Sequence, residues 1–381
     1  MGLKEDAMAP IGIGMLGFGS MGKLHTLAWR TLPSIYPDMP AFRLAAVCTK
    51  SRESAEEALR QGGFARSHDT IEELVTDPEV SVIDCVLPND AHKTAISAAL
   101  SAGKHIYCEK PLALSGAEAR ELATLAAASK GRLGITFNYR FLPAIMRAKR
   151  LLDEGVLGEI YSFEFEYLHS GYQDSTRPLT WRMRKEMSGG GALVDLGAHI
   201  IDLARYLLGE FAEVAALTKT WVAERPLHKG SEEKGAVTVD DAAWVTARLA
   251  SGALGTLVVS RFATGAADDL RFRIEGSKGA LRFDLMDANW LYHFDATRPA
   301  ADLGWNRLET IQNYPGASVP PARAIVGWER SHAENQYRFL AAVAEGREPS
   351  PGIADGLAAH LVTDAAYEAA LRGIWVPVPK A

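Results

Sequence analysis

The stretch IGIGMLGFGSMG, residues 11–22, decides the fold of the first part of the chain. Residues 11–18 form an apolar run typical of a buried strand, and residues 20–32, SMGKLHTLAWRTL, repeat apolar side chains at helical spacing. Between them lies the pattern G-x-G-x-x-G. A strand, a glycine-rich turn and a helix in this order predict the first unit of a βαβ fold.

The glycine-rich turn has the spacing of a phosphate-binding loop. Gly17 permits a tight turn, Gly19 lets a pyrophosphate approach the backbone, and Gly22 lets the helix pack closely against the strand. The helix N-terminus offers free N–H groups and the positive end of its dipole to phosphate. Glycines also form ordinary turns, but the flanking strand and helix favour dinucleotide binding. The residues predicted to contact the cofactor here are Gly17, Phe18, Gly19, Ser20, Met21 and Gly22.

The alternation of strand and helix continues to about residue 140. Further strands are predicted at residues 42–49, 80–87, 104–108 and near 132–138, with helical patterns between them. Such alternation implies a parallel sheet joined by right-handed crossovers. We therefore expect residues 1–140 to form an α/β Rossmann domain with a doubly wound parallel sheet.

The tip of the second predicted strand bears on the choice of dinucleotide. An acid at this position pairs with the ribose 2′-OH of NAD, whereas a cation accommodates the 2′-phosphate of NADP. Here the sequence is Cys48-Thr49-Lys50-Ser51-Arg52, and no acid occurs between Phe42 and Arg52. These residues favour NADP or the use of both cofactors, although Lys50 and Arg52 are alternatively solvated charges before a helix. NAD or NADP is therefore expected, with contacts from Thr49, Lys50 and Arg52.

Polar residues follow the ends of two later strands. Ligands of doubly wound sheets lie beyond the carboxyl ends of the strands. Pro88 and Asn89 end one strand, and Glu109, Lys110 and Pro111 end the next. A purely structural pair of Glu109 and Lys110 would be a surface ion pair of little value. We therefore expect these residues at the cofactor edge of the sheet.

A second group of polar residues lies in SGGGALVDLGAHIIDLARYLLGE, residues 188–210. Asp195 and His199 are four residues apart, so a continuous helix would place them on one face. A carboxylate beside an imidazole fixes its tautomer and raises its pKa, which suits a general base near neutral pH. Asp202 is the alternative partner of His199. A plain surface pair is the competing interpretation, and because no third ligand with metal spacing accompanies the pair, we expect no metal.

The remainder of the chain has the period of β-strands. From Glu159 onward, segments such as EIYSFEFEYL and AAWVTARLA alternate polar and apolar residues and are joined by glycine-containing turns. We expect residues 141–381 to form an α+β domain with an open, mostly antiparallel sheet. The length of 381 residues is consistent with two domains.

The composition argues against several classes of protein. A net charge of −6 without a long basic run makes nucleic acid an unexpected partner. No apolar run of about 18 residues occurs, so no membrane partner is expected. The N-terminal MGLKEDAMAP lacks the basic and apolar regions of a secretory signal, which predicts a cytoplasmic protein. Cys48, Cys85 and Cys108 lie in apolar runs and are expected to be buried reduced thiols.

Taken together, three ordered motifs resemble the Gfo/Idh/MocA family, the glucose-fructose oxidoreductase and inositol dehydrogenase group. They are GFGSMG near the start, CEKPLAL at residues 108–114 and GGGALVDLGAHIIDL at residues 189–203. Smaller likenesses are LPNDAH, FNYRFLPA and TWRM. The likeness spans nearly the whole chain, but it says almost nothing about which substrate is bound.

The resemblance implies a Rossmann domain followed by an open, mostly antiparallel sheet domain, with the active site between them. The family's catalytic lysine corresponds to Lys110 and its D-x-x-x-H pair to Asp195 and His199, and Lys110–Pro111 is a candidate cis peptide bond. A homo-oligomer, dimer or tetramer, formed through the sheet is also implied. The residues implied on the cofactor side are Pro88, Asn89, His92, Glu109 and Lys110, and those on the substrate side are Lys110, Tyr139, Arg182, Asp195 and His199.

The residues and the resemblance together predict an enzyme. Hydride leaves a carbinol carbon only as its O–H proton departs, so a base is needed, and His199 can serve. An ammonium beside the developing oxyanion stabilises it, which suits Lys110, while Asp195 balances charge and orients the imidazole. We expect an NAD(P)-dependent oxidoreductase that transfers a hydride between the nicotinamide and a secondary hydroxyl or ketone of a small-molecule sugar, cyclitol or related polyol. The alternative is a non-catalytic NAD(P)-binding sensor of the same fold.

Overall fold

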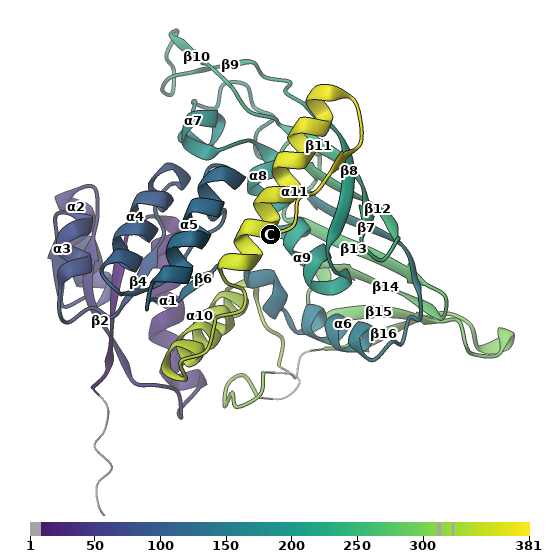
Figure 1. The fold of residues 1–381 in the computed structure, drawn as a ribbon, viewed down its shortest axis with the longest axis horizontal. Helices are drawn as coiled ribbons and strands as arrows, with labels where there is room; N and C mark the ends of the chain where they lie inside the picture. The colour runs from purple at the N-terminus through teal and green to yellow at the C-terminus, as the bar shows by residue number, and fades with distance from the viewer. Residues whose placement is uncertain (1–8, 311–313, 322–323) are drawn as a thin grey trace, which may run out of the picture.

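The first domain of the computed structural model is built on a six-stranded parallel sheet (Figure 1). The structure describes residues 9–310, 314–321 and 324–381. Residues 1–8, which belong to the N-terminal stretch used to predict the localisation, lie outside the described residues. The strand order β3-β2-β1-β4-β5-β6 reverses between β1 and β4, so the sheet is doubly wound as predicted. The strands are β1 (Ile11–Leu16), β2 (Phe42–Cys48), β3 (Arg66–His68), β4 (Val82–Cys85), β5 (His105–Cys108) and β6 (Leu133–Ile135).

Helix α1 follows the glycine-rich turn directly. Gly17 has a φ of 94°, which favours glycine. A Cβ atom at Gly22 would lie 2.8 Å from the carbonyl oxygen of Gly17, so only glycine lets the helix approach the turn this closely. The helices of this domain are α1 (Ser20–Ile35), α2 (Arg52–Glu57), α3 (Ile71–Thr76), α4 (Asn89–Ser101) and α5 (Gly116–Ala128).

The second domain contains a nine-stranded sheet in the order β16-β15-β14-β13-β7-β12-β11-β8-β17. Only the pairing of β7 with β12 is parallel, so the predicted open and mostly antiparallel sheet is confirmed. Burial alternates along β11, which gives the sheet one covered and one exposed face. The strands are β7 (Ile160–Leu168), β8 (Phe211–Lys219), β11 (Ala242–Leu249), β12 (Leu254–Ser260), β13 (Asp269–Gly276), β14 (Gly279–Asp284), β15 (Trp290–Asp295), β16 (Trp305–Glu309) and β17 (Val376–Pro377).

Four α-helices and one small hairpin lie in this domain before residue 240. Helix α9 packs on β7 and β12, and α6 packs on β14 and β15. The hairpin projects from the domain at the top of Figure 1. These elements are α6 (Pro143–Asp153), α7 (Lys185–Ser188), α8 (Ala192–Asp195), α9 (Gly197–Leu208), β9 (Glu224–Pro226) and β10 (Lys234–Ala236).

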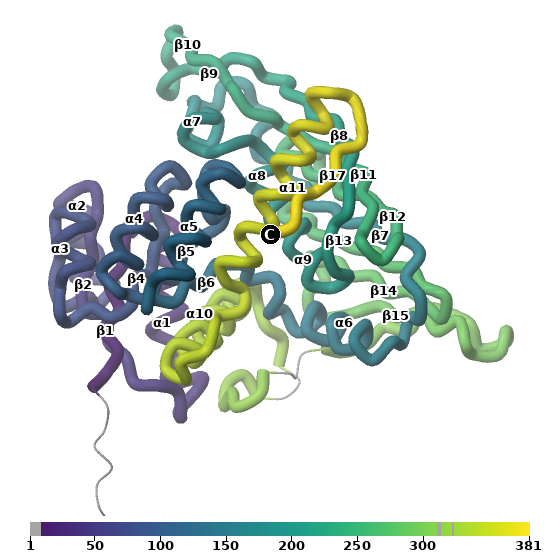
Figure 2. The backbone as a smooth tube through the Cα atoms, in the orientation of Figure 1, coloured from purple at the N-terminus to yellow at the C-terminus, as the bar shows by residue number. Residues whose placement is uncertain are grey.

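The last two helices return to the first domain. Helix α10 (Trp328–Ala344) packs on α1, and its Phe339 and Leu340 share a buried cluster with Trp29 and Tyr107. Helix α11 (Ile353–Arg372) contacts α5 on one side and β8 on the other, and Figure 2 shows it running between the two domains. The C-terminal part of the chain therefore ties the two sheets together.

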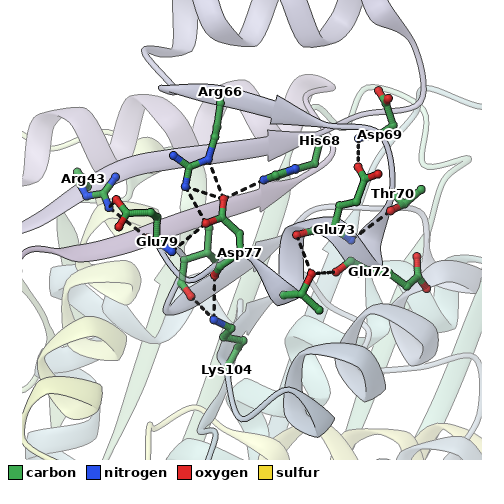
Figure 3. A network of polar contacts seen from close by, with 12 residues as sticks. Arg43, Arg66, His68, Asp69, Thr70, Glu72, Glu73, Asp77, Glu79 and Lys104 are labelled. Carbon is green, nitrogen blue, oxygen red and sulfur yellow. Dashed lines mark hydrogen bonds and ion pairs between the residues drawn. The ribbon is translucent and has the colours of Figure 1, made fainter.

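A polar network around Asp77 links β3 to the segments before β4 and β5 in the first domain (Figure 3). Asp77 accepts hydrogen bonds of 2.8 and 2.7 Å from Arg66 and lies 2.9 Å from Nε2 of His68. Its own carbonyl oxygen accepts a bond from Lys104 at the start of β5. Burial alone would raise the pKa of Asp77, but the bonds from His68 and Arg66 lower it to about 2.

Two further sequence predictions concern burial and membranes. Cys48, Cys85 and Cys108 are buried and free, as expected. Among the described residues, no helix combines the length and the apolar character needed to cross a bilayer.

Candidate active site

A cavity of about 790 Å³ lies at the carboxyl ends of the first domain's strands and is lined by residues of both domains. It brings together nearly all of the residues predicted from the sequence. A Cβ atom built on Gly19 would have no atom of the chain within 4 Å, so the turn is open toward this space, as a bound pyrophosphate requires. The predicted residues that line the cavity are Gly17, Phe18, Gly19, Ser20, Met21, Thr49, Lys50, Pro88, Asn89, Glu109, Lys110, Tyr139, Arg182, Asp195 and His199.

Three predicted cofactor residues do not line the cavity. Gly22 serves the packing of α1 and makes no cavity surface. The side chain of Arg52 is 91% exposed and pairs with Glu56 one helical turn along α2. His92 is fully buried, and its ring nitrogens lie 2.8 and 2.9 Å from the carbonyl oxygens of Pro111 and Leu87. Arg52 and His92 are therefore not part of the cavity lining, and their contacts with the cofactor stay predictions; the buried ring of His92 joins two segments that form the cavity wall.

Lys110 reaches across the cavity to the second domain. Its Nζ donates to Oδ1 of Asp195 over 2.8 Å and to the carbonyl oxygen of Asp195 over 3.0 Å. Arg261, which is 2% exposed, donates to the other carboxylate oxygen of Asp195 over 2.9 Å. Burial acts to raise the pKa of Asp195, but the ammonium of Lys110 and the guanidinium of Arg261 hold it well below its usual value. Asp195 is therefore an anion bonded by one cation from each domain.

The expected hydrogen bond from the imidazole of His199 to an aspartate is not formed within the described residues. Asp195 ends α8 and His199 lies on α9, but the two carboxylate oxygens of Asp195 are bonded by Lys110 and Arg261 instead. The alternative partner, Asp202, instead accepts a hydrogen bond of 2.8 Å from the buried Arg140. Within the described part of the chain, Nδ1 of His199 is buried without a hydrogen-bond partner.

The pKa of His199 is lowered, whereas the sequence predicted that a neighbouring carboxylate would raise it. Burial, followed by the neighbouring ammonium of Lys110, holds this pKa well below its ordinary value, so the imidazole is neutral. Edge-to-face packing orients the ring instead of a carboxylate: the ring centroids of Tyr139 and Tyr167 lie 4.8 and 5.9 Å from that of His199. A neutral imidazole held in this way can still accept a proton.

Several residues of the cavity were not predicted. Tyr167 and His169 come from the end of β7 and the residue after it, and Trp328 and His332 from the first turns of α10. Tyr167 and His169 are two residues apart, so an extended chain places them on the same face. The sequence would have predicted them if the inward face of this strand had been assigned. No local pattern marks the α10 residues, because their neighbours in the site lie far away in the chain.

Two groups of side chains in the described residues have metal ligand atoms within 4.8 Å of one another: Cys85, His92 and Cys108, and His25, Glu109 and His332. Both ring nitrogens of His92 already have carbonyl partners. Both ring nitrogens of His25 have carboxylate partners. We therefore assign no metal to either group. The Lys110–Pro111 peptide bond is cis, as the resemblance implies.

The fold and the cavity define a class of protein: an oxidoreductase that binds a nicotinamide dinucleotide and acts on a CH–OH group. Residues 11–137 match the family model described as "Oxidoreductase family, NAD-binding Rossmann fold", and residues 145–282 match the GFO/IDH/MocA C-terminal domain. The chain belongs to the Gfo/Idh/MocA family. The comparisons give no support to the lean toward NADP or to the sensor alternative.

Related proteins match over nearly the full length. A levoglucosan dehydrogenase of Pseudarthrobacter phenanthrenivorans is 36% identical, covering 98% of this chain and 99% of that protein. An inositol 2-dehydrogenase of Rhizobium meliloti is 29% identical, covering 93% and 94%. The solved structure of a levoglucosan dehydrogenase in complex with NADH and L-sorbose has a TM-score of 0.93 at 35% identity, covering 98% of this chain and 100% of that one. An NAD binding oxidoreductase from Klebsiella pneumoniae has the same TM-score at 31% identity, again covering 98% and 100%.

Proposed function

We propose that this protein is an NAD(H)-dependent dehydrogenase that oxidises a secondary hydroxyl of a sugar, cyclitol or related polyol, or reduces the corresponding ketone. The observation that carries the proposal is the meeting of Lys110 and His199 in one cavity with the glycine-rich turn. A sensor has no use for a neutral imidazole and an ammonium at the same place. Relatives named levoglucosan dehydrogenase and inositol 2-dehydrogenase support a sugar or cyclitol as the substrate.

Three side chains divide the chemistry. The neutral imidazole of His199 takes the proton of the substrate hydroxyl as the C–H bond breaks. The ammonium of Lys110 lies where it can stabilise the negative charge that develops on the substrate oxygen. Asp195 fixes that ammonium through the 2.8 Å bond to Oδ1, so its role is to position Lys110. A bound nicotinamide supplies the hydride acceptor in oxidation and the hydride donor in reduction.

NAD(H) is the proposed cofactor for two reasons. The structural neighbour carries NADH, and Arg52, one of the two cations expected near a 2′-phosphate, is turned to solvent. Lys50 does line the cavity, and the strand tip has no acid to repel a phosphate. Activity with NADP must therefore be measured beside activity with NAD.

The substrate end of the cavity is formed by residues of the second domain together with Tyr139 at the end of the first. Tyr139 and Arg182 line it with His199, and we propose that both contact the substrate. The guanidinium of Arg182 stacks on the ring of Trp181 at 4.3 Å, which fixes its direction while its donors stay available.

The exposed face of the second sheet is proposed to bind a second copy of the chain. Large apolar side chains remain exposed there, among them Leu217 at 68% and Trp244 at 42%. Exposed apolar surface of this kind is typical of protein interfaces. Light scattering on the purified protein should give a dimer or tetramer; a monomer at micromolar concentration would contradict this part of the proposal.

The decisive experiment is a screen of the purified protein with NAD and with NADP against levoglucosan, myo-inositol and a panel of sugars and polyols. Turnover is followed by the absorbance of the reduced nicotinamide, and cofactor affinity by protein fluorescence. Reduction of NAD by at least one panel member is expected. Tight cofactor binding without turnover of any panel member would favour the sensor instead.

A further inference from the structure

A buried imidazolium lies behind the cavity wall. His25 in α1 is fully buried, with Nδ1 lying 2.9 Å from Oδ1 of Asp84 and Nε2 lying 3.0 Å from Oε1 of Glu109. Burial alone would lower the pKa of His25, but the two carboxylates raise it to about 10. Both ring nitrogens therefore donate, and His25 has no capacity left for a ligand.

A second histidine, His332 in α10, lies between this imidazolium and the cavity. It lines the cavity and is 2% exposed, and its ring centroid lies 5.7 Å from that of His25. Among the described residues neither of its ring nitrogens has a hydrogen-bond partner. Burial and the positive charge of His25 lower the pKa of His332 to about 3, so the ring is neutral at any working pH. A neutral imidazole carries one donor and one acceptor, and both are unused here.

An unpaired polar side chain at this depth points to a ligand. Leaving a buried donor or acceptor without a partner is unfavourable, and such groups in native proteins generally have a function or an unseen partner. The ring of Trp328, one helical turn before His332, packs edge-on against it at 4.6 Å and also lines the cavity. Together they place an apolar ring beside an imidazole without a hydrogen-bond partner, which matches the apolar C–H surface and a hydroxyl of a polyol.

We propose that His332 is a substrate-binding residue that receives one hydroxyl of the sugar or polyol other than the reacting one, with the ring of Trp328 against the substrate's carbon skeleton. This inference rests on the proposed function, because it names a further contact in the same site. It makes the beginning of α10 a determinant of specificity, separate from the transfer of hydride and proton at Lys110 and His199.

The test compares His332→Phe, His332→Gln and a control, His293→Phe. His293 in β15 also has a buried ring nitrogen without a partner among the described residues, but it does not line the cavity. For a substrate found in the screen, His332→Phe should raise KM about three- to tenfold, the effect of losing one hydrogen bond to a neutral group, and leave the Kd of NADH within about twofold. His332→Gln, which keeps a donor and an acceptor, should recover part of the loss. His293→Phe should change neither constant.

Deoxy analogues of the same substrate identify the contact. The wild type should discriminate against one monodeoxy analogue, and His332→Phe should treat that analogue and the parent almost equally. The inference is overturned if His332→Phe weakens NADH binding while KM stays constant, because the residue would then contact the cofactor. It is also overturned if no analogue shows reduced discrimination in the variant.

The inference can fail separately from the proposed function. If the wild type binds NADH but turns over no compound, the proposed dehydrogenase activity is contradicted, and calorimetry of levoglucosan binding to the NADH complex becomes the assay. Weaker binding by His332→Phe would then still support the contact, and the absence of binding to the wild type would overturn it. NADH binding and thermal unfolding show whether each variant is folded, and His332→Gln supplies the comparison if His332→Phe is not.

Discussion

Replacing Lys110 with methionine removes one charge from the site and keeps most of the side chain's stem. In the folded protein this ammonium contacts both the carboxylate and the carbonyl oxygen of Asp195. The carboxylate keeps its 2.9 Å bond from Arg261 in the variant, so it stays ionised and does not become an uncompensated buried charge. Lys110→Met should therefore fold and bind NADH.

The magnitude follows from the two roles of the ammonium. The lysine and aspartate side chains are 15% and 30% exposed, so the ion pair is only partly shielded from water, and its loss should lower the free energy of unfolding by about 1 kcal/mol. Removing a preorganised donor from a developing oxyanion costs about 3 kcal/mol in the transition state, or about 100-fold in kcat. The loss of activity should therefore far exceed the loss of stability.

The assay measures kcat, KM and the Kd of NADH for the wild type, for Lys110→Met and for a control, Lys93→Met. Lys93 lies in α4, pairs with Glu121 on the surface and does not line the cavity. The control should retain wild-type kinetics. If kcat of Lys110→Met stays within about threefold of the wild type while NADH still binds, the ammonium does not stabilise the reacting oxygen, and the reasoning is refuted.

Three other changes test separate parts of the structure. Thr49→Asp should raise the ratio of kcat/KM with NAD to that with NADP, because an acid at the strand tip repels a 2′-phosphate; a lower ratio would reverse the interpretation of this position. Asp77→Asn should lower the free energy of unfolding by about 2 kcal/mol at pH 7, since the hydrogen bonds from His68 and Arg66 hold the folded pKa at about 2. This contribution is present above the unfolded pKa of about 4 and is lost as the pH falls toward 2, so urea unfolding of wild type and variant should converge in that range. Arg140→Met leaves the buried Asp202 without the guanidinium that bonds it and should lower the free energy of unfolding by about 3–5 kcal/mol, against no change in the Kd of NADH.

The fold was predictable because its signals are local. The spacing of apolar residues in β1 and α1, and the glycines between them, belong to one continuous stretch, and the period of two in β7 and β11 likewise needs no distant partner. The parallel pairing of β7 with β12 was not predictable, because strands so far apart in the chain carry no mark of their mutual direction. The packing of α10 on α1 was not predictable either, because it depends on contacts between segments far apart in the chain.

The residues of the candidate site also divide into those with a local sequence signal and those placed by distant contacts. Lys110 was found because the carboxyl ends of parallel strands share one edge of the sheet. The pairing of Asp195 with His199 was mispredicted because the cations that bond this carboxylate, Lys110 and Arg261, are distant from it in the chain. Arg261 was missed because its partner, Asp195, lies 66 residues away, and only the folded chain joins them. His332 was missed for the same reason.

The aspartate between two cations also reports on the alignment of the domains. Lys110 extends from the end of β5 and Arg261 follows β12, so Asp195 is bonded at once from the Rossmann half and from the sheet half. Because Lys110 is the cation from the first domain in this group, we expect a separation of the two domains to break the bond between its ammonium and Asp195. The rate of turnover should therefore depend on how the two domains are placed relative to each other. Mild denaturant should abolish activity at concentrations where circular dichroism still shows both domains folded.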